Sequence, residues 1–156
     1  MKKVFRNMSL IAAFAIIAAL GLLAYIRLAP SDPAVWHVSP VTAATVGQGT
    51  CLDSIATQVN GARVACQSKD TPETLLARLD QVALATPRTT RLAGTPESGR
   101  ITWITRTALI GYPDYTTAEA TQTAAGSRLD IYARQRFGAS DLGVNTARLR
   151  AWLKDL

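Results

Sequence analysis

The sequence predicts an α+β protein in which a single N-terminal transmembrane helix precedes a small domain, an antiparallel four-stranded meander flanked by an amphipathic helix and a C-terminal helix. Three observations predict this arrangement. One apolar run fills the N-terminal region, two later segments repeat apolar residues at helical spacing, and turn signals separate four strand-like segments between them. The length of 156 residues leaves room for one globular domain, which we place at residues 51–156.

The apolar run is the strongest feature of the chain. Residues 7–26 contain no charge, and about 20 residues at ~1.5 Å each span the ~30 Å hydrocarbon layer of a bilayer. Basic residues precede the run, so residues 1–27 are predicted to form a cytoplasmic N-terminus and a transmembrane helix. We expect a single-pass protein of the bacterial inner membrane with its C-terminal domain in the periplasm. A cleaved signal peptide is the alternative, but the run is long and the stretch after it, 29–31, has a central proline.

The net charge of +6 does not indicate a nucleic-acid-binding protein. Four of the 17 basic residues flank the apolar run, which leaves 13 basic against 11 acidic side chains in residues 28–156. Aromatic residues that could stack on bases are scattered along the chain rather than grouped with basic ones. We therefore expect no nucleic acid among the partners.

Cys51 and Cys66 fit an exported domain. Two thiols in an oxidising compartment normally form a disulfide, and this one would close a loop that contains the turn signal Asn60-Gly61. By the chain-entropy relation such a bond contributes roughly 3 kcal/mol. Two buried free cysteines are the alternative. Two thiolates and the distant His37 are too few for a metal site, and no cofactor is implied.

Prolines punctuate residues 28–50, which we expect to form a stalk or an extended lead-in rather than a continuous helix. The clearest soluble helix follows, from about Pro72 to Ala85, with Thr71 as its N-cap. Its apolar residues recur at helical spacing and give it one apolar face. This face must be covered, and we expect it to lie on a sheet.

Four strands are predicted at residues 88–93, 100–110, 115–123 and 128–137, and their short connections favour an antiparallel meander. In the second strand Ile101, Trp103 and Leu109 share a face. The fourth alternates apolar residues, up to Phe137, with polar residues on the opposite face. One side of the sheet is therefore expected to be core and the other polar.

A C-terminal amphipathic helix is predicted after the strands. Asn145 is its expected N-cap, and Gly143 gives the backbone freedom just before it. The apolar residues at i, i+3, i+4 and i+7 are Leu149, Trp152, Leu153 and Leu156.

The stretch Arg-Gln-Arg-Phe-Gly-Ala-Ser-Asp-Leu-Gly-Val-Asn at residues 134–145, followed by Arg148, resembles the closing signature of the bacterial and plant family called domain of unknown function 1499. Pro87-Arg88-Thr89 and Gly111-Tyr112-Pro113-Asp114-Tyr115 are similar to two further turns of that family, so the resemblance spans roughly residues 72–156. The chain lacks the Cys-Pro-rich opening segment of many members, and has Pro113 and Asp114 in place of the usual paired aspartates. The family has no established activity, and the resemblance implies an envelope-associated domain.

The signature also supplies a candidate ligand site. Two of its arginines project from one strand face, and a turn with polar side chains enters a helix whose free amides can hold an anion. We expect a site for a phosphate, a carboxylate or a lipid headgroup. The candidate residues are Arg106, Arg134, Arg136, Ser140, Asp141, Asn145 and Arg148.

A purely structural role for these residues is the alternative. Asp141 or Asn145 then caps the helix, Gly143 adopts a positive φ angle, and the arginines pair with Glu119 and Asp130 across a solvated sheet face.

Three functions follow from these observations. The first is a membrane-tethered binding or accessory module of the cell envelope, with a lipid, an anion or another envelope protein as its partner. The second is an envelope assembly factor that acts only by protein contacts. The third is a hydrolase-like enzyme, for which His37 would have to fold against a nucleophile such as Ser140. No nucleophile elbow, zinc-protease motif, P-loop or Rossmann pattern occurs, so we assign no catalytic residue.

Overall fold

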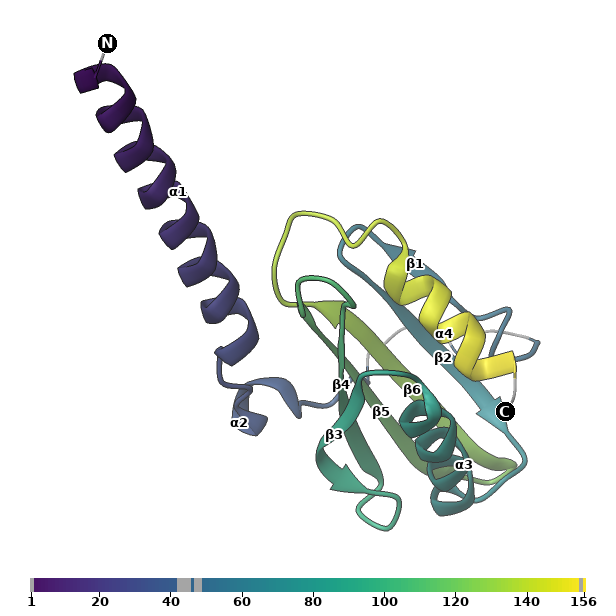
Figure 1. The fold of residues 1–156 in the computed structure, drawn as a ribbon. Coiled ribbons are helices and arrows are strands. Elements are labelled where there is room, and N and C mark those ends of the chain that lie inside the picture. The colour runs from purple at the N-terminus through teal and green to yellow at the C-terminus, as the bar shows by residue number, and fades with distance from the viewer. Residues whose placement is uncertain (1, 42–45, 47–48, 155) are drawn as a thin grey trace.

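The computed structural model describes residues 2–41, 46, 49–154 and 156 (Figure 1). Residues 42–45 and 47–48 of the predicted stalk lie outside the described residues. The helices are α1 (Lys2–Leu28), α2 (Pro33–Trp36), α3 (Pro72–Ala85) and α4 (Val144–Lys154), and the strands are β1 (Ala56–Gln58), β2 (Gly61–Ser68), β3 (Thr89–Thr95), β4 (Arg100–Arg106), β5 (Pro113–Thr123) and β6 (Gly126–Gln135).

The sheet has six antiparallel strands in the order β1-β2-β6-β5-β4-β3. The predicted meander forms its β3–β6 part, but the prediction of four strands was wrong. β2 runs along the whole of β6, from the pair Gly61 and Arg134 to the pair Ser68 and Ser127. Sequence reasoning missed β2 because its core-facing residues are mostly small, and missed β1 because its three residues are all exposed.

Two strands end earlier than predicted. β4 stops at Arg106, and Leu109 lies in the following loop with 88% of its surface exposed, so it does not share a core face with Trp103. β6 stops at Gln135, and Phe137 leaves the sheet to contact the rings of Tyr25 and Tyr112 at centroid distances of 6.2 and 6.0 Å. In both cases an apolar residue was assigned to the core from the sequence because it continued the alternation of apolar and polar residues. The strand ends before that residue.

The core lies between one face of the sheet and the helices α3 and α4 (Figure 1). α3 has the predicted bounds, and the Thr71 hydroxyl accepts a hydrogen bond from the Thr74 amide at 3.3 Å, as an N-cap does. Trp103 of β4 and Trp152 of α4 meet edge to face at 5.6 Å. The Trp103 indole donates to the buried carboxylate of Asp80, so this polar group is not left unsatisfied.

The start of α4 differs from the prediction. Asn145 is fully buried within the helix and is not its N-cap. The Asp141 carboxylate instead accepts hydrogen bonds from the amides of Gly143 and Asn145, both at 3.0 Å. Gly143 has the expected positive φ angle, 80°, which glycine adopts without steric cost.

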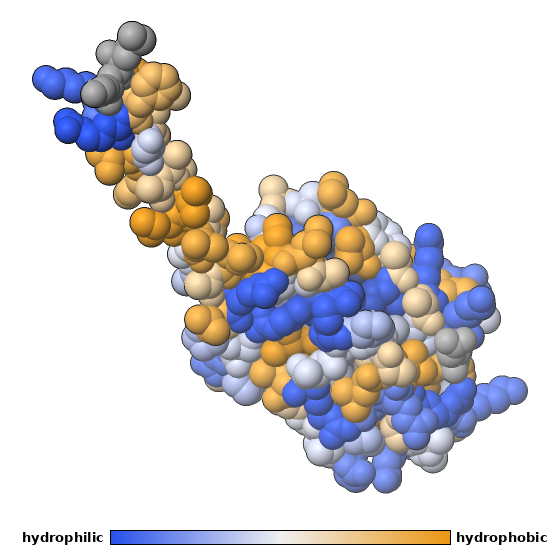
Figure 2. All heavy atoms as spheres, viewed as in Figure 1, coloured by the Kyte–Doolittle hydropathy of each residue, from blue (hydrophilic) through white to orange (hydrophobic). Residues whose placement is uncertain are grey.

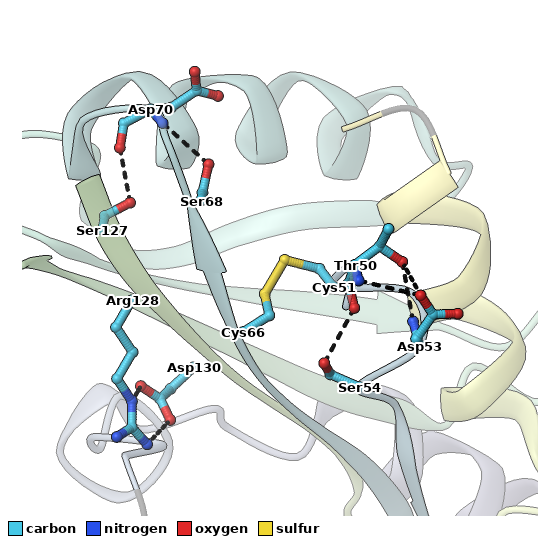
Figure 3. The surroundings of a disulfide bond; sticks show 10 residues. All are labelled: Thr50, Cys51, Asp53, Ser54, Cys66, Ser68, Asp70, Ser127, Arg128 and Asp130. Carbon is cyan, nitrogen blue, oxygen red and sulfur yellow. Dashed lines mark hydrogen bonds and ion pairs between the residues drawn. A yellow bond between two sulfur atoms is a disulfide. The ribbon is translucent and has the colours of Figure 1, made fainter. Parts of the chain in front are cut away.

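Cys51 and Cys66 form the predicted disulfide, with their Cα atoms 5.0 Å apart (Figure 3). Cys66 lies in β2 and is fully buried, whereas Cys51 belongs to the turns that precede β1. Figure 3 shows the Thr50 hydroxyl and amide hydrogen-bonded to the Asp53 carboxylate on the Cys51 side of the bond. The disulfide therefore fastens this irregular segment to the sheet.

The second face of the sheet is polar, as predicted, but it is not simply solvated. Residues 29–40, which we call the strap, cross it after α1. Trp36 of the strap stacks on Tyr115 of β5, with ring centroids 3.7 Å apart and planes 8° apart. The His37 ring Nδ1 lies 2.9 Å from the Thr102 hydroxyl, and Arg63 donates to the Pro40 carbonyl at 3.1 Å.

α1 is apolar and exposed over nearly its whole length. Within the described residues, Lys3–Leu28 is the one helix long and apolar enough to cross a membrane by length and composition. Only at its end do residues become buried: Ile26 is 4% exposed, and Ala29 just beyond is 5% exposed. Figure 2 shows apolar side chains running along α1 and continuing onto the adjoining part of the domain.

Candidate functional site at the loop edge of the sheet

Four connections meet at one end of the sheet, which we call the loop edge, and three of them bear residues of the family resemblance. It comprises the β1–β2 turn at 59–60, the turn before β3 at 86–88, the β4–β5 loop at 107–112 and the β6–α4 loop at 136–143. Main-chain hydrogen bonds join two of these connections, since the Asp141 amide donates to the Val59 carbonyl at 3.2 Å. The last turn of α1 reaches the same edge, where Arg27 donates to the carbonyls of Leu109 and Ile110.

The predicted site residues fall into separate groups. Arg134 and Arg136 lie on the polar face, where both contact the strap. Arg134 donates to the Trp36 carbonyl at 2.8 Å, and Arg136 donates to the Pro30 carbonyl at 2.8 Å. Their guanidinium groups lie 5.3 and 5.9 Å from the centroid of the Trp36 ring. These two arginines hold the strap on the sheet.

The expected carboxylate partners of these arginines pair elsewhere. Glu119 forms an ion pair with Arg100 at 2.7 Å, and Asp130 forms one with Arg128 at 2.7 Å. Arg134 is 9% exposed, and its Nη1 has no hydrogen-bond partner among the described residues. Burial lowers the pKa of its guanidinium, because the charged form loses solvation.

The second group is a buried polar network between β5 and α4. Arg148 donates to the Asp114 carboxylate at 2.8 Å and also to the Asn145 side-chain oxygen. The Asn145 side-chain amide donates to the Asp141 carboxylate at 2.9 Å. The network thus joins Asp114 of the central turn to the closing signature, two parts of the family pattern that are far apart in the sequence.

Asp114 is the carboxyl group most affected by this environment. Burial raises its pKa, while the hydrogen bond and the charge of Arg148 act in the opposite direction and the nearby Asp141 charge adds to the rise. Sequence reasoning quoted Asp114 within the family resemblance but left it out of the candidate site. The sequence feature that could have identified Asp114 as a site residue is an aspartate near the start of a strand, with Arg148 of the signature as an available partner.

A hollow of about 320 Å³ opens beside this network. Asp114, Ser140 and Asp141 line it, together with the side chains of the two long loops. The Ser140 hydroxyl accepts a hydrogen bond from the Leu142 amide at 3.2 Å, as in a turn. Two carboxylates line this hollow, and the Asp114 carboxylate is paired with Arg148 beside it.

His37 and Ser140 are not brought together. The His37 ring binds the hydroxyl of Thr102, a residue that is fully buried and hydrogen-bonded onward to Thr117 at 2.9 Å. Burial lowers the pKa of His37, Arg100 adds to this shift and Glu119 opposes it. Among the described residues, no group of three or more His, Cys, Asp or Glu side chains could hold a metal ion.

Arg106 stands apart from both groups. It donates to the Gly111 carbonyl at 3.0 Å and lies beside Arg27 and Arg88, which sequence reasoning did not place in a site. Arg88 belongs to the Pro-Arg-Thr turn of the family resemblance. The signal that could have found it is its position before a strand, at the same end of the sheet as the 107–112 loop.

The fold is that of a small α+β domain with an apolar N-terminal helix, in which a buried polar network joins the central strand β5 to α4 at one end of an antiparallel sheet. The chain belongs to the family described as Protein of unknown function (DUF1499), which matches residues 40–156. The resemblance is confirmed, and the match begins well before residue 72, so that it includes β1, β2 and the disulfide.

The chain is similar to the X-ray crystal structure of protein MLL2253 from Mesorhizobium loti. The TM-score is 0.45 and the sequence identity 15%, and the similarity covers 60% of this chain and 96% of that chain. A search of curated proteins found no significant match.

Proposed function

We propose that this protein is a membrane-tethered module of the bacterial cell envelope that binds a lipid, an anion or a protein partner on the periplasmic side. The observation that carries this proposal is α1, an apolar helix of 27 residues whose side chains are exposed until its last turn. An exposed apolar surface of this length is unfavourable in water and favourable in a bilayer. The basic residues before it favour a cytoplasmic N-terminus.

Two further observations support the proposal. The Cys51–Cys66 disulfide is typical of an oxidising compartment. The contacts of the last turn of α1 with the domain support an uncleaved anchor rather than a signal peptide. Cleavage near residue 28 would remove the bonds of Arg27 to the 107–112 loop and the contact of Tyr25 with Phe137.

A topology experiment tests this proposal. A reporter that is active only in the periplasm and one that is active only in the cytosol are each fused after Leu156, and the mature N-terminus is sequenced. We expect activity of the periplasmic reporter alone and a mature chain that retains α1. Activity of the cytosolic reporter alone, or a mature chain that starts beyond Leu28, would contradict the proposal.

An assembly factor that acts by protein contacts is the second candidate. The exposed leucines of the loop edge favour it, since Leu109 is 88% and Leu142 is 91% exposed. Crosslinking in cells from positions 109 and 142 distinguishes the two functions. A single protein partner captured at both positions would favour the assembly factor over a module that binds lipid, and capture of lipid alone would favour the lipid-binding module.

A further inference from the structure

A second hollow, of about 420 Å³, lies at the loop edge beside the end of α1. Three arginines from separate elements line it: Arg27 of α1, Arg88 of the turn before β3, and Arg106 at the end of β4. The side chains of Thr90 and Thr107 lie with them, and no acidic residue of the described chain lines the hollow. Three positive charges therefore converge here without a carboxylate between them.

Main-chain carbonyls hold all three guanidinium groups in place. Arg27 donates to Ile110 and Leu109 at 3.1 and 2.7 Å. Arg106 donates to Gly111 at 3.0 Å, and Arg88 donates to the carbonyl of Arg106 at 3.1 Å. A carbonyl orients a guanidinium but does not neutralise it, and each guanidinium has five N–H donors, so further donors stay free for a ligand.

Five arginines of the domain pair with carboxylates, namely Arg78, Arg91, Arg100, Arg128 and Arg148. In the part of the chain that the structure describes, Arg134 and Arg136 do not, and like the three arginines of the hollow they donate to main-chain carbonyls. Arg27, Arg88 and Arg106 form no ion pair within the described residues. The hollow is thus a place where oriented positive charge lacks an internal partner, which favours binding of an anion.

The backbone of Arg88 gives an independent indication. Its φ angle is 61°, a left-handed conformation that is uncommon for residues other than glycine and asparagine. Glycine would adopt this angle without steric cost, so the backbone alone does not require an arginine here. The side chain supplies the hydrogen bond to the Arg106 carbonyl and one of the three charges of the hollow.

We propose that the hollow between Arg27, Arg88 and Arg106 binds a phosphate group, presented by an anionic phospholipid or as free phosphate. Arginine matches phosphate geometry with paired N–H donors, and the charge-assisted bonds that result are the stronger class. The lipid source rests on the proposed function. With α1 across a bilayer, Arg27 directly follows the apolar run 7–26, so the hollow lies at headgroup depth.

The loop beside the hollow suits a lipid in particular. Leu109 and Ile110, whose carbonyls bind Arg27, expose 88% and 40% of their surfaces. Apolar side chains next to a phosphate site can enter the acyl region while the arginines stay with the headgroups.

The test is a set of titrations of the full chain, with its disulfide formed, in uncharged detergent. The probes are dihexanoyl phosphatidate, dihexanoyl phosphatidylcholine and inorganic phosphate, each followed by calorimetry. The variants are Arg88→Gly and Arg106→Gln, with Arg150→Gln as a control for charge, since Arg150 is exposed on α4.

We expect phosphatidate to bind more tightly than phosphatidylcholine, and each hollow variant to weaken phosphatidate binding about tenfold. The Arg150→Gln variant should bind within about twofold of the native chain. Arg88→Gly should keep or raise the thermal midpoint, which separates loss of binding from loss of folding. If inorganic phosphate binds as tightly as phosphatidate and shows the same dependence on both arginines, the ligand is free phosphate and the site stands.

Equal binding of phosphatidate to all four proteins, or binding of neither phosphatidate nor phosphate, would overturn the proposal. The titrations do not depend on topology, because they are made in detergent. A chain that fails the reporter test but binds phosphate through Arg88 and Arg106 would lose the proposed tether and keep the site.

Discussion

At the scale of single residues, Asp141, Asn145 and Arg148 of the family signature make contacts that stabilise the fold. Asp141 accepts hydrogen bonds from amides just before and within the first turn of α4, and Asn145 and Arg148 extend this cap to Asp114 of β5. Every one of these contacts is internal to the domain. The signature residues of this network therefore fix the helix on the sheet edge.

Removing one partner of the buried Asp114–Arg148 pair should be costly. Both side chains are less than 10% exposed, so Asp114→Ala leaves a buried guanidinium without its carboxylate. We expect a loss of about 3–5 kcal/mol in the free energy of unfolding, measured by urea denaturation of the full chain in detergent.

The exposed pair of Asp70 and Arg78 is the matched control, and Asp70→Ala should cost less than about 1 kcal/mol. The double variant Asp114→Ala with Arg148→Met should recover part of the loss, because no charge is then left buried. Equal losses for Asp114→Ala and Asp70→Ala would show that the network does not stabilise the domain.

The lowered pKa of His37 predicts a pH dependence of stability. The folded state binds its proton less readily than the unfolded state, so the contribution of His37 is present above its usual pKa of about 6.5 and is lost as pH falls below that value. The urea midpoint of the native chain should decrease from about pH 7.5 to about pH 5 more than that of His37→Gln. A parallel decrease in both proteins would exclude His37 as the cause.

The site was only partly predictable at this scale. The helix cap at Asp141 was one of the roles that the sequence left open, because an aspartate shortly before a helix can accept hydrogen bonds from nearby backbone amides. The partners of Arg134 and Arg136 were not predictable. They are main-chain carbonyls of the strap and, for Arg136, also the Tyr115 hydroxyl, and the residue type at a position does not show which carbonyl an arginine will meet.

At the scale of elements, the strap is the least expected part of the structure. It places Trp36 between the sheet and solvent, with one face on Tyr115 and with Arg134 and Arg136 beside it. The prolines in this segment indicated a break in the helix but gave no information about which surface the chain would meet. The surface that the strap meets depends on the stacking of Trp36 on Tyr115, a contact between residues far apart in the sequence.

Trp36→Ala should loosen the strap. The variant loses the stacked contact with Tyr115, which is worth about 0.5–1.5 kcal/mol beyond area burial, together with the apolar area of the indole itself. We expect faster amide exchange at strap residues 34–37 and a stability loss of about 2 kcal/mol. Val35→Ala is the control, because Val35 lies on the same helical turn and is 59% exposed. Similar exchange in both variants would contradict a role for the stacking.

The disulfide is an element-scale constraint as well. Replacing Cys51 by alanine opens the link between the segment before β1 and the buried Cys66 in β2. We expect a loss of roughly 3 kcal/mol in the free energy of unfolding by the chain-entropy relation, measured by urea denaturation. An unchanged urea midpoint for the alanine variant would show that β1 and the preceding turns are held without it.

Elements with strong local signals were predicted closely, and the others were not. α3 was predicted to the residue, since Thr71 and Pro72 mark its start and Thr86-Pro87 its end. β1 was not predicted, because its three exposed residues show no hydrophobic alternation. β2 was not predicted either, because the small side chains of Gly61, Ala62 and Ala65 give it little hydrophobic pattern. Their place in the sheet comes from pairing with β6, which is a long-range contact.

At the scale of the whole molecule, α1 and the domain form one continuous arrangement. The end of α1 contacts the loop edge through Arg27 and Tyr25, and the strap then carries the chain over the polar face. The apolar surface of α1 thus passes directly into the exposed apolar residues of the loop edge (Figure 2).

A charge in the middle of α1 should disturb membrane insertion. Arginine at the centre of a transmembrane helix costs about 2.5–3.5 kcal/mol on the insertion scale, so Ile16→Arg should move a large share of the chain out of the carbonate-resistant membrane fraction. Asn7→Arg adds the same charge at the basic end of the helix and should leave the fraction unchanged. Equal extraction of both variants would contradict a membrane-spanning α1.

The way in which α1 joins the domain limits how far the protein can reach. Arg27 in the last turn of α1 binds the 107–112 loop, and the strap that follows binds the sheet, so no unattached linker separates the helix from the domain. With α1 in a bilayer, the domain would travel in two dimensions at one fixed height and spin mainly about the bilayer normal. Any molecule that it meets would have to approach the lipid surface, and would encounter the same flank of the domain every time.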